Sequence, residues 1–305
     1  MKQIAEALSL MPDVAIEPRL GGALAWVGME GIAVPVHIDS GSGTTLQLIA
    51  SVDALVNLVD TNQRGIHMSR LYRLIDEQLA AMPLDVAALE HLLQAFLHSQ
   101  HGLADRARIR LRYDQPVRRK ALRSDLHGWR VYPVTIEATL DHDGLITSVA
   151  TEVTYSSTCP ASAALARQAI QEHFTRSLSS PTPVPHDTVL AWLGNEQGIV
   201  ATPHAQRSVA YVWTRLAHGA AWNIVALIDR IEASLGTPVQ AMVKREDEQA
   251  FALANGDNLM FCEDAARRIQ RALDQDRDIA DFHVRVEHQE SLHPHNAVAH
   301  AEKGR

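Results

Sequence analysis

The chain has 305 residues, of which 46% are hydrophobic and 21% are charged, as is usual for a folded globular protein with a sizeable core. Its net charge of -8 argues against nucleic acid or an anionic membrane surface as the main partner. The N-terminus lacks the apolar region of a signal peptide, and the most apolar stretch, Ala220 to Ile228, is too short to span a bilayer. Two cysteines make no disulfide framework, so we expect a cytoplasmic protein.

The first half of the chain alternates between strand-like and helix-like patterns. Residues Ala23 to Asp39 predict two short strands around a glycine turn. Alternating apolar positions predict further strands, and two stretches with helical spacing lie between them. The strands are expected at Thr44 to Leu58, Arg106 to Tyr113, Gly128 to Leu140 and Leu145 to Tyr155, and the helices at Met68 to Ala81 and Asp85 to His98.

The second half has a similar order of elements. A helix is expected from Ala161 to Leu178, followed by the proline-rich segment SSPTPVPHDT. Beyond it we expect a strand at Arg207 to Leu216, a helix at Trp222 to Leu235, one or two helices within Glu246 to Leu273 and a strand at Asp281 to His288.

The order strands, two helices, strands therefore occurs twice, without any repeat at the level of residues. This order favours an α+β fold in which antiparallel sheets carry helix pairs on one face. We expect one domain over residues 1–305, with two similar halves at about 12–140 and 141–293, and a polar tail at 294–305.

The residues that could carry chemistry are scattered along the chain. Cys159 lies between a strand and a helix, where functional residues are common, although free cysteines are more often buried core residues. Cys262 lies inside a helical pattern and is interpreted as core. Histidine, the common metal ligand and proton carrier, occurs 16 times. Taken singly, His204, Glu248 and Glu263 are more often surface residues than ligands. His293 follows Glu290 by three residues and precedes a second histidine, so its segment is denser in chemical groups than a random tail. None of these spacings makes a compact zinc motif.

Five segments in this order resemble the GTP cyclohydrolase type IB family, and together they span nearly the whole chain. They are GIHMSR (Gly65 to Arg70), STCPAS (Ser157 to Ser162), HAQRS (His204 to Ser208), KREDE with FCED (Lys244 to Asp264) and ESLHPHNA (Glu290 to Ala297). The resemblance implies the tunnelling fold, in which subunits assemble into barrels with active sites at their interfaces. It also implies the conversion of GTP and water to 7,8-dihydroneopterin triphosphate and formate, the first step of folate synthesis.

The resemblance also assigns roles to residues. Cys159, His204, Glu248 and His293 match the ligands of one divalent metal ion (Mn, Fe or Zn), with Cys159, His204 and Glu290 as catalytic residues. Glu263 matches the carboxylate that anchors guanine. Candidates for the remaining substrate contacts are His67, Arg70, Arg207, Lys244 and Arg245. The expected partners are GTP and further copies of the chain, as a dimer or tetramer.

Two features depart from the family pattern. Its second cysteine, two residues after the first, is replaced by Ala161, and the interval from Cys159 to His204 is longer than usual. The alternatives are therefore a nitrile reductase of the same fold, which would use NADPH without a metal, and a non-catalytic oligomeric paralogue.

Overall fold

A computed structural model describes residues 21–41, 43–80, 82–179 and 183–304. Its strands are β1 (Leu24–Asp39), β2 (Thr45–Leu58), β3 (Ala107–Lys120), β4 (His127–Asp141), β5 (Gly144–Thr158), β6 (Ala205–Leu216), β7 (Ile279–His288) and β8 (Ala297–Glu302). Its helices are α2 (Met68–Leu79), α3 (Val86–Ser99), α4 (Pro160–Ser177), α5 (His186–Leu193), α6 (Ile224–Leu235), α7 (Arg245–Asp257) and α8 (Cys262–Asp274). No helix within the described residues is long and apolar enough to cross a membrane.

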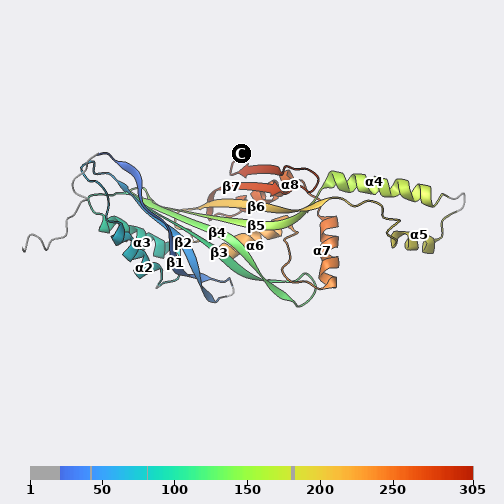
Figure 1. Ribbon diagram of the computed structural model, residues 1–305, viewed down its shortest axis with the longest axis horizontal. Coiled ribbons are helices and arrows are strands. Elements are labelled where there is room, and N and C mark those ends of the chain that lie inside the picture. The colour runs from blue at the N-terminus through green and yellow to red at the C-terminus, as the bar shows by residue number, and fades with distance from the viewer. Residues whose placement is uncertain (1–20, 42, 81, 180–182, 305) are drawn as a thin grey trace, which may run out of the picture. The chain divides into compact units, whose positions relative to one another are not determined.

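All eight strands belong to one sheet, in which they follow one another in chain order from β1 to β8 (Figure 1). The pairs β1–β2, β2–β3 and β7–β8 are antiparallel. The expectation of a tunnelling fold built from antiparallel sheets in two similar halves is therefore wrong. Each strand pairs with the next along the chain, and the pairing continues where the halves were expected to separate, at the β4–β5 turn.

The chain divides into two compact units, and neither is a single stretch of sequence. Unit 1 contains the described residues up to Gln115 together with Pro133–Ala150 and Thr214–Ile224. Unit 2 contains Pro116–Tyr132, Thr151–Trp213 and the described residues from Val225 onward. The division of the domain at residues 140 and 141 stays a prediction, and its first residues, 12–20, lie outside the described part of the chain.

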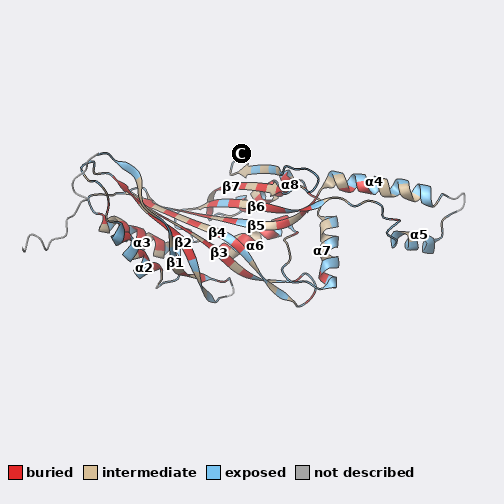
Figure 2. Cartoon of the chain, in the orientation of Figure 1, coloured by how far each residue is buried: buried red, intermediate tan, exposed pale blue. Residues whose placement is uncertain are grey.

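Local patterns explain most of these elements. In β3 the apolar residues Ala107, Ile109 and Leu111 are fully buried, and the arginines between them lie on the opposite face (Figure 2). The buried residues of α8 recur at helical spacing: Cys262, Ala265, Ala266, Ile269 and Leu273. Helix α3 begins where the Asp85 side chain accepts a hydrogen bond of 2.7 Å from the Ala88 N–H.

Three local expectations differ from the structure. The two strands expected in Ala23 to Asp39 are one strand, β1, whose pairing with β2 shifts register next to Gly31, where φ is 74°. The proline-rich segment leads into an additional helix, α5, in which no residue is buried although Leu190 and Leu193 are apolar. The expected tail contains β8, which pairs with β7.

Candidate active site

Four chain segments meet within unit 2, where β5 and β7 end and where β6 and α8 begin. The Cys159 N–H at the end of β5 donates to the His204 carbonyl before β6, over 3.2 Å. The Met260 N–H, just before α8, donates to the carbonyl of Thr158 over 3.2 Å. Beyond β7 the Gln289 N–H donates to the Arg207 carbonyl over 3.1 Å. These bonds bring three of the five sequence motifs to one end of unit 2.

Cys159 occupies the N-cap of α4 and is half-buried. Its Sγ accepts a hydrogen bond of 3.5 Å from the Ser162 N–H, and Pro160 starts the helix in the position that proline favours. The hydroxyl of Ser162 accepts a hydrogen bond of 3.1 Å from the His204 N–H. Cys159 and His204 are thus held together directly by one backbone hydrogen bond and indirectly through the Ser162 hydroxyl. Ala161, in the place of the family's second cysteine, is exposed in the first turn of α4.

The His204 side chain is half-buried, with 20% of its surface exposed, and its Nδ1 faces two oxygen atoms. Gln206 Oε1 lies 2.9 Å from this nitrogen, and Glu290 Oε2 lies 3.8 Å from it. The structure therefore brings together Cys159, His204 and Glu290, the three residues predicted to be catalytic.

A buried group of polar side chains lies beside His204, and the sequence analysis did not identify it. Ser157 Oγ is 2.8 Å from Ser208 Oγ and 3.3 Å from His288 Nδ1. The other ring nitrogen of His288 is hydrogen bonded to the Tyr155 hydroxyl over 2.9 Å. Burial lowers the pKa of His288 to about 4, although nearby Glu263 opposes this shift. Tyr155 and Ser157 alternate along β5, Ser208 lies on β6, and His288 ends β7. The strand period of two is the one sequence signal that could have pointed to the β5 pair.

Glu263, the predicted guanine anchor, lies exposed in the first turn of α8. One of its carboxylate oxygens accepts a hydrogen bond of 3.3 Å from the Cys262 thiol. Burial and then the Glu263 carboxylate raise the pKa of Cys262 to about 11. Cys262 is buried, as predicted for a core residue, and its thiol stays protonated at neutral pH.

Glu248 and His293 lie exposed on other segments of unit 2. Glu248 belongs to the first turn of α7, and His293 stacks on His295 at a ring-centroid distance of 5.1 Å. The start of α7 is held by buried Asp247, which accepts hydrogen bonds from backbone N–H groups of Lys244, Arg123 and Ser124.

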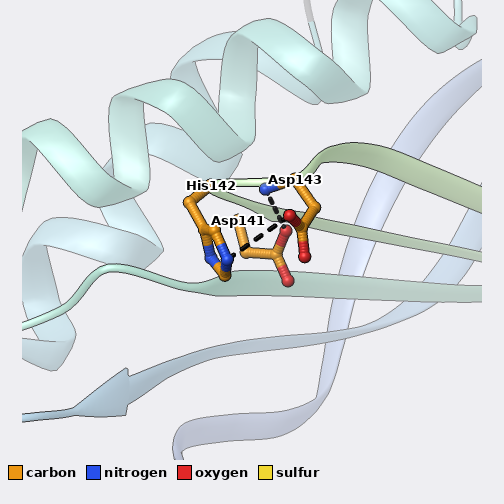
Figure 3. A group of neighbouring side chains, drawn as sticks. All are labelled: Asp141, His142 and Asp143. Carbon is orange, nitrogen blue, oxygen red and sulfur yellow. Dashed lines mark hydrogen bonds and ion pairs between the residues drawn. The ribbon is translucent and has the colours of Figure 1, made fainter.

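Asp141, His142 and Asp143 form a group of side chains that could hold a metal ion (Figure 3). Their potential ligand atoms lie within 4.8 Å of one another, and no other group of three or more among the described residues does so. It lies in unit 1, at the turn between β4 and β5, where Asp141 Oδ1 accepts a hydrogen bond of 2.9 Å from the Asp143 N–H. Such bonds are usual in turns without any ion. The predicted ligands Cys159, His204, Glu248 and His293 do not form such a group in this conformation.

The predicted cationic residues lie in both units. Arg207, Lys244 and Arg245 are exposed in unit 2. In unit 1, Arg70 Nη1 donates to the Ser99 carbonyl over 2.7 Å and lines a cavity of about 630 Å³ between α2 and α3. His67 precedes α2, where its backbone exchanges two hydrogen bonds with the Gln100 side chain.

Comparison with known proteins shows which family the chain matches. Residues 11–299 match the family described as type I GTP cyclohydrolase folE2. The GTP cyclohydrolase FolE2 of Pseudomonas putida is 49% identical over 291 residues, which cover 95% of this chain and 94% of that protein. The protein of the same name from Bdellovibrio bacteriovorus is 48% identical over 96% of both chains. The resemblance to a type I GTP cyclohydrolase is confirmed, and the matching family is described as FolE2 rather than as type IB.

Among solved structures, uricase from Arthrobacter globiformis matches with a TM-score of 0.47. The two proteins are 9% identical, and the match covers 92% of this chain and 95% of the uricase. A likeness at this level assigns neither fold nor function.

Proposed function

This chain belongs to the type I GTP cyclohydrolase FolE2 family, and from that membership we propose that it converts GTP and water to 7,8-dihydroneopterin triphosphate and formate at the cluster of Cys159, His204 and Glu290. The observation that carries this proposal is the adjacency of residues from three separate motifs: the backbone of Cys159 is hydrogen bonded to that of His204, and the Glu290 carboxylate lies 3.8 Å from the His204 imidazole. GTP cyclohydrolase activity supplies the pterin precursor of folate, so the enzyme has a place in folate biosynthesis.

The side chains of the cluster suit a divalent metal ion. A half-buried thiol and an imidazole lie on adjacent segments, and sulfur with nitrogen is a donor set that suits Zn or Fe(II). Glu248 and His293 would complete the set, and both are exposed, so neither is locked into other buried contacts. A carboxylate ligand also admits Mn(II). A bound metal supplies a water molecule acidic enough to act as a nucleophile at neutral pH.

Guanine recognition is proposed for Glu263. Its carboxylate can accept two parallel hydrogen bonds from guanine N1–H and the exocyclic amine. Adenine lacks this pair of donors, so the complex with ATP would lose both of these hydrogen bonds to the carboxylate. The proposal therefore expects strong preference for GTP over ATP.

Glu290 is proposed to transfer protons during ring opening. Its side chain is 13% exposed and lies beside the His204 imidazole, so it can reach the same reacting centre. The triphosphate would be bound by cations from Arg70, Arg207, Lys244 and Arg245, with His67 near Arg70. We also propose that the protein acts in the cytoplasm as a homo-oligomer, a dimer or tetramer.

Substitution Cys159→Ala tests the proposal. The variant should lose at least about 100-fold in affinity for Zn²⁺, Mn²⁺ or Fe²⁺, because a thiolate ligand is removed, and formate release from GTP should fall with it. The measurements are metal content after dialysis and formate production from GTP under anaerobic conditions.

Cys262→Ala is the matched control, since it removes the other, buried thiol and should retain metal binding. Wild-type protein that releases no formate from GTP with any of the three metals would contradict the proposal. Metal-free protein that consumes NADPH would support a reductase instead.

A further inference from the structure

Gln206 is a buried residue of β6 with no role assigned so far. It lies two residues after His204 and 8% of its surface is exposed. Since side chains alternate along a strand, residues at this spacing share one face. Its carboxamide is therefore an internal neighbour of the His204 imidazole, not a solvated surface group.

The nitrogen end of this amide is held by buried side chains. Gln206 Nε2 donates a hydrogen bond of 3.1 Å to Ser157 Oγ. Ser157 is fully buried and also contacts Ser208 and His288, so its position is set by three neighbours. With the nitrogen engaged there, the oxygen of the amide faces His204 at 2.9 Å.

The surroundings of His204 Nδ1 select one form of the ring. Gln206 Oε1 is an acceptor only, and a second acceptor, Glu290 Oε2, lies 3.8 Å from the same nitrogen. A neutral imidazole carries one proton, and two oxygens beside Nδ1 stabilise it there. Nε2 then keeps its lone pair, the form in which histidine binds a metal or accepts a proton.

We propose that Gln206 is a positioning residue that holds His204 in the Nδ1–H tautomer and so presents Nε2 as the metal ligand. The metal part of this inference rests on the proposed function, whereas the tautomer is a property of the metal-free chain. Groups that orient a ligating histidine through its other ring nitrogen are known to strengthen metal binding by about 10- to 100-fold.

The first test is nuclear magnetic resonance of metal-free, full-length protein labelled with ¹⁵N-histidine. Long-range proton–nitrogen correlation spectra identify which ring nitrogen carries the proton, at a pH well above the usual histidine pKa of about 6.5. The His204→Asn spectrum identifies the signals of His204 by their loss. We expect Nδ1 protonated in the wild type, and protonation at Nε2 would overturn the proposal.

Two variants of Gln206 separate positioning from packing. Gln206→Leu removes the acceptor at similar size, so His204 should shift toward the Nε2–H form and Zn²⁺ affinity should fall by about 10- to 100-fold. Gln206→Glu keeps an acceptor oxygen and should retain both the tautomer and an affinity near that of the wild type. Affinity is measured by competition with a chelator.

Gln240→Leu is the control, because this half-buried amide of unit 2 donates to the Pro238 carbonyl, and it should leave both readouts unchanged. An unchanged tautomer and affinity in Gln206→Leu would overturn the proposal, as would equal losses in the leucine and glutamate variants. The tautomer is measured without metal or GTP, so its result stands even if GTP proves not to be the substrate. Failure of the tautomer proposal can therefore be told apart from failure of the proposed function.

Discussion

His288 is a titratable side chain enclosed in the interior of unit 2, and its burial has a consequence for stability. It is 3% exposed, and both ring nitrogens contact neutral hydroxyl groups of Tyr155 and Ser157. A charged imidazolium would lose its hydration there without gaining a close carboxylate partner. The folded state therefore favours neutral His288.

This burial predicts a loss of stability in mild acid. The pKa of His288 is about 4 in the folded chain and about 6.5 when unfolded, so between these values the unfolded chain binds more protons. The contribution to stability is present above pH 6.5 and is lost as the pH falls. Between pH 7 and pH 5 the loss amounts to about 2 kcal/mol. Urea denaturation of the wild type and of His288→Gln at both pH values measures it.

The variant should lack this part of the pH dependence, whereas His142→Gln should retain it, because His142 is exposed at a turn. The prediction would be refuted if the unfolding free energy changed equally between pH 7 and pH 5 in the wild type and in His288→Gln.

At the scale of elements, helix α6 is joined to β3 and β4 mainly through the carboxylate of Glu232. Glu232 accepts hydrogen bonds from Arg130 Nη1 and from the Tyr132 hydroxyl, the latter at 2.6 Å. Arg119 Nη2 forms an ion pair with it at 3.0 Å. Burial and then Glu232 raise the pKa of Tyr132 to about 12, so its hydroxyl remains a donor. Arg119 Nη1 also pairs with Asp229 of the same helix over 2.5 Å, so Arg130 and Tyr132 depend on Glu232 more than Arg119 does.

Removing this carboxylate should be strongly destabilising. Glu232→Ala leaves two half-buried or buried arginines without their shared partner, and loss of one side of a buried ion pair costs roughly 3–5 kcal/mol. Equilibrium denaturation in urea gives the change in unfolding free energy.

The exposed helical pair Arg73–Glu77 provides the comparison. Glu77→Ala should change stability by less than about 0.5 kcal/mol, since both side chains are mostly in water. A similar small change for Glu232→Ala would show that α6 does not depend on this network.

For the whole molecule, the eight-stranded sheet ends at β8, the short strand where a polar tail was expected. Its six residues pair with β7 in regular antiparallel register from Ala297 to Glu302. The Gln270 side chain of α8 donates to the Glu302 carbonyl over 3.1 Å. The strand therefore covers both the edge of β7 and part of α8.

A chain that stops after Pro294 should lose roughly 2 kcal/mol or more, since β7 would lose its pairing partner. The newly exposed edge should also promote association through unpaired backbone groups. Thermal denaturation and light scattering measure these effects. Removal of Gly304 and Arg305 alone keeps β8 and should leave both properties nearly unchanged, and stability unaffected by the longer deletion would contradict the prediction.

Some helices and strands of this fold could be predicted from the sequence, whereas others, and the pairing of the strands, could not. The strands around Ile109 and Val134 and the helices α3 and α8 follow from local alternation or helical spacing, because burial of one face repeats along the chain. Helix α5 has only eight residues, too few to display a clear helical period, and it buries none of them. The joining of all strands into one sheet depends on pairing between distant segments, which periodicity does not specify.

The sequence by itself determined the resemblance to a type I GTP cyclohydrolase, through motifs in order over nearly the whole chain, and that resemblance singled out Cys159, His204 and Glu290. Only the tertiary structure decided that the Cys159 backbone and the Glu290 carboxylate lie next to His204, and that Gln206 links His204 to the buried side chains of Ser157 and His288. Contacts such as Ser157 to His288 join residues 131 positions apart. They depend on strand register and burial across the sheet, and these arise only when the chain has folded.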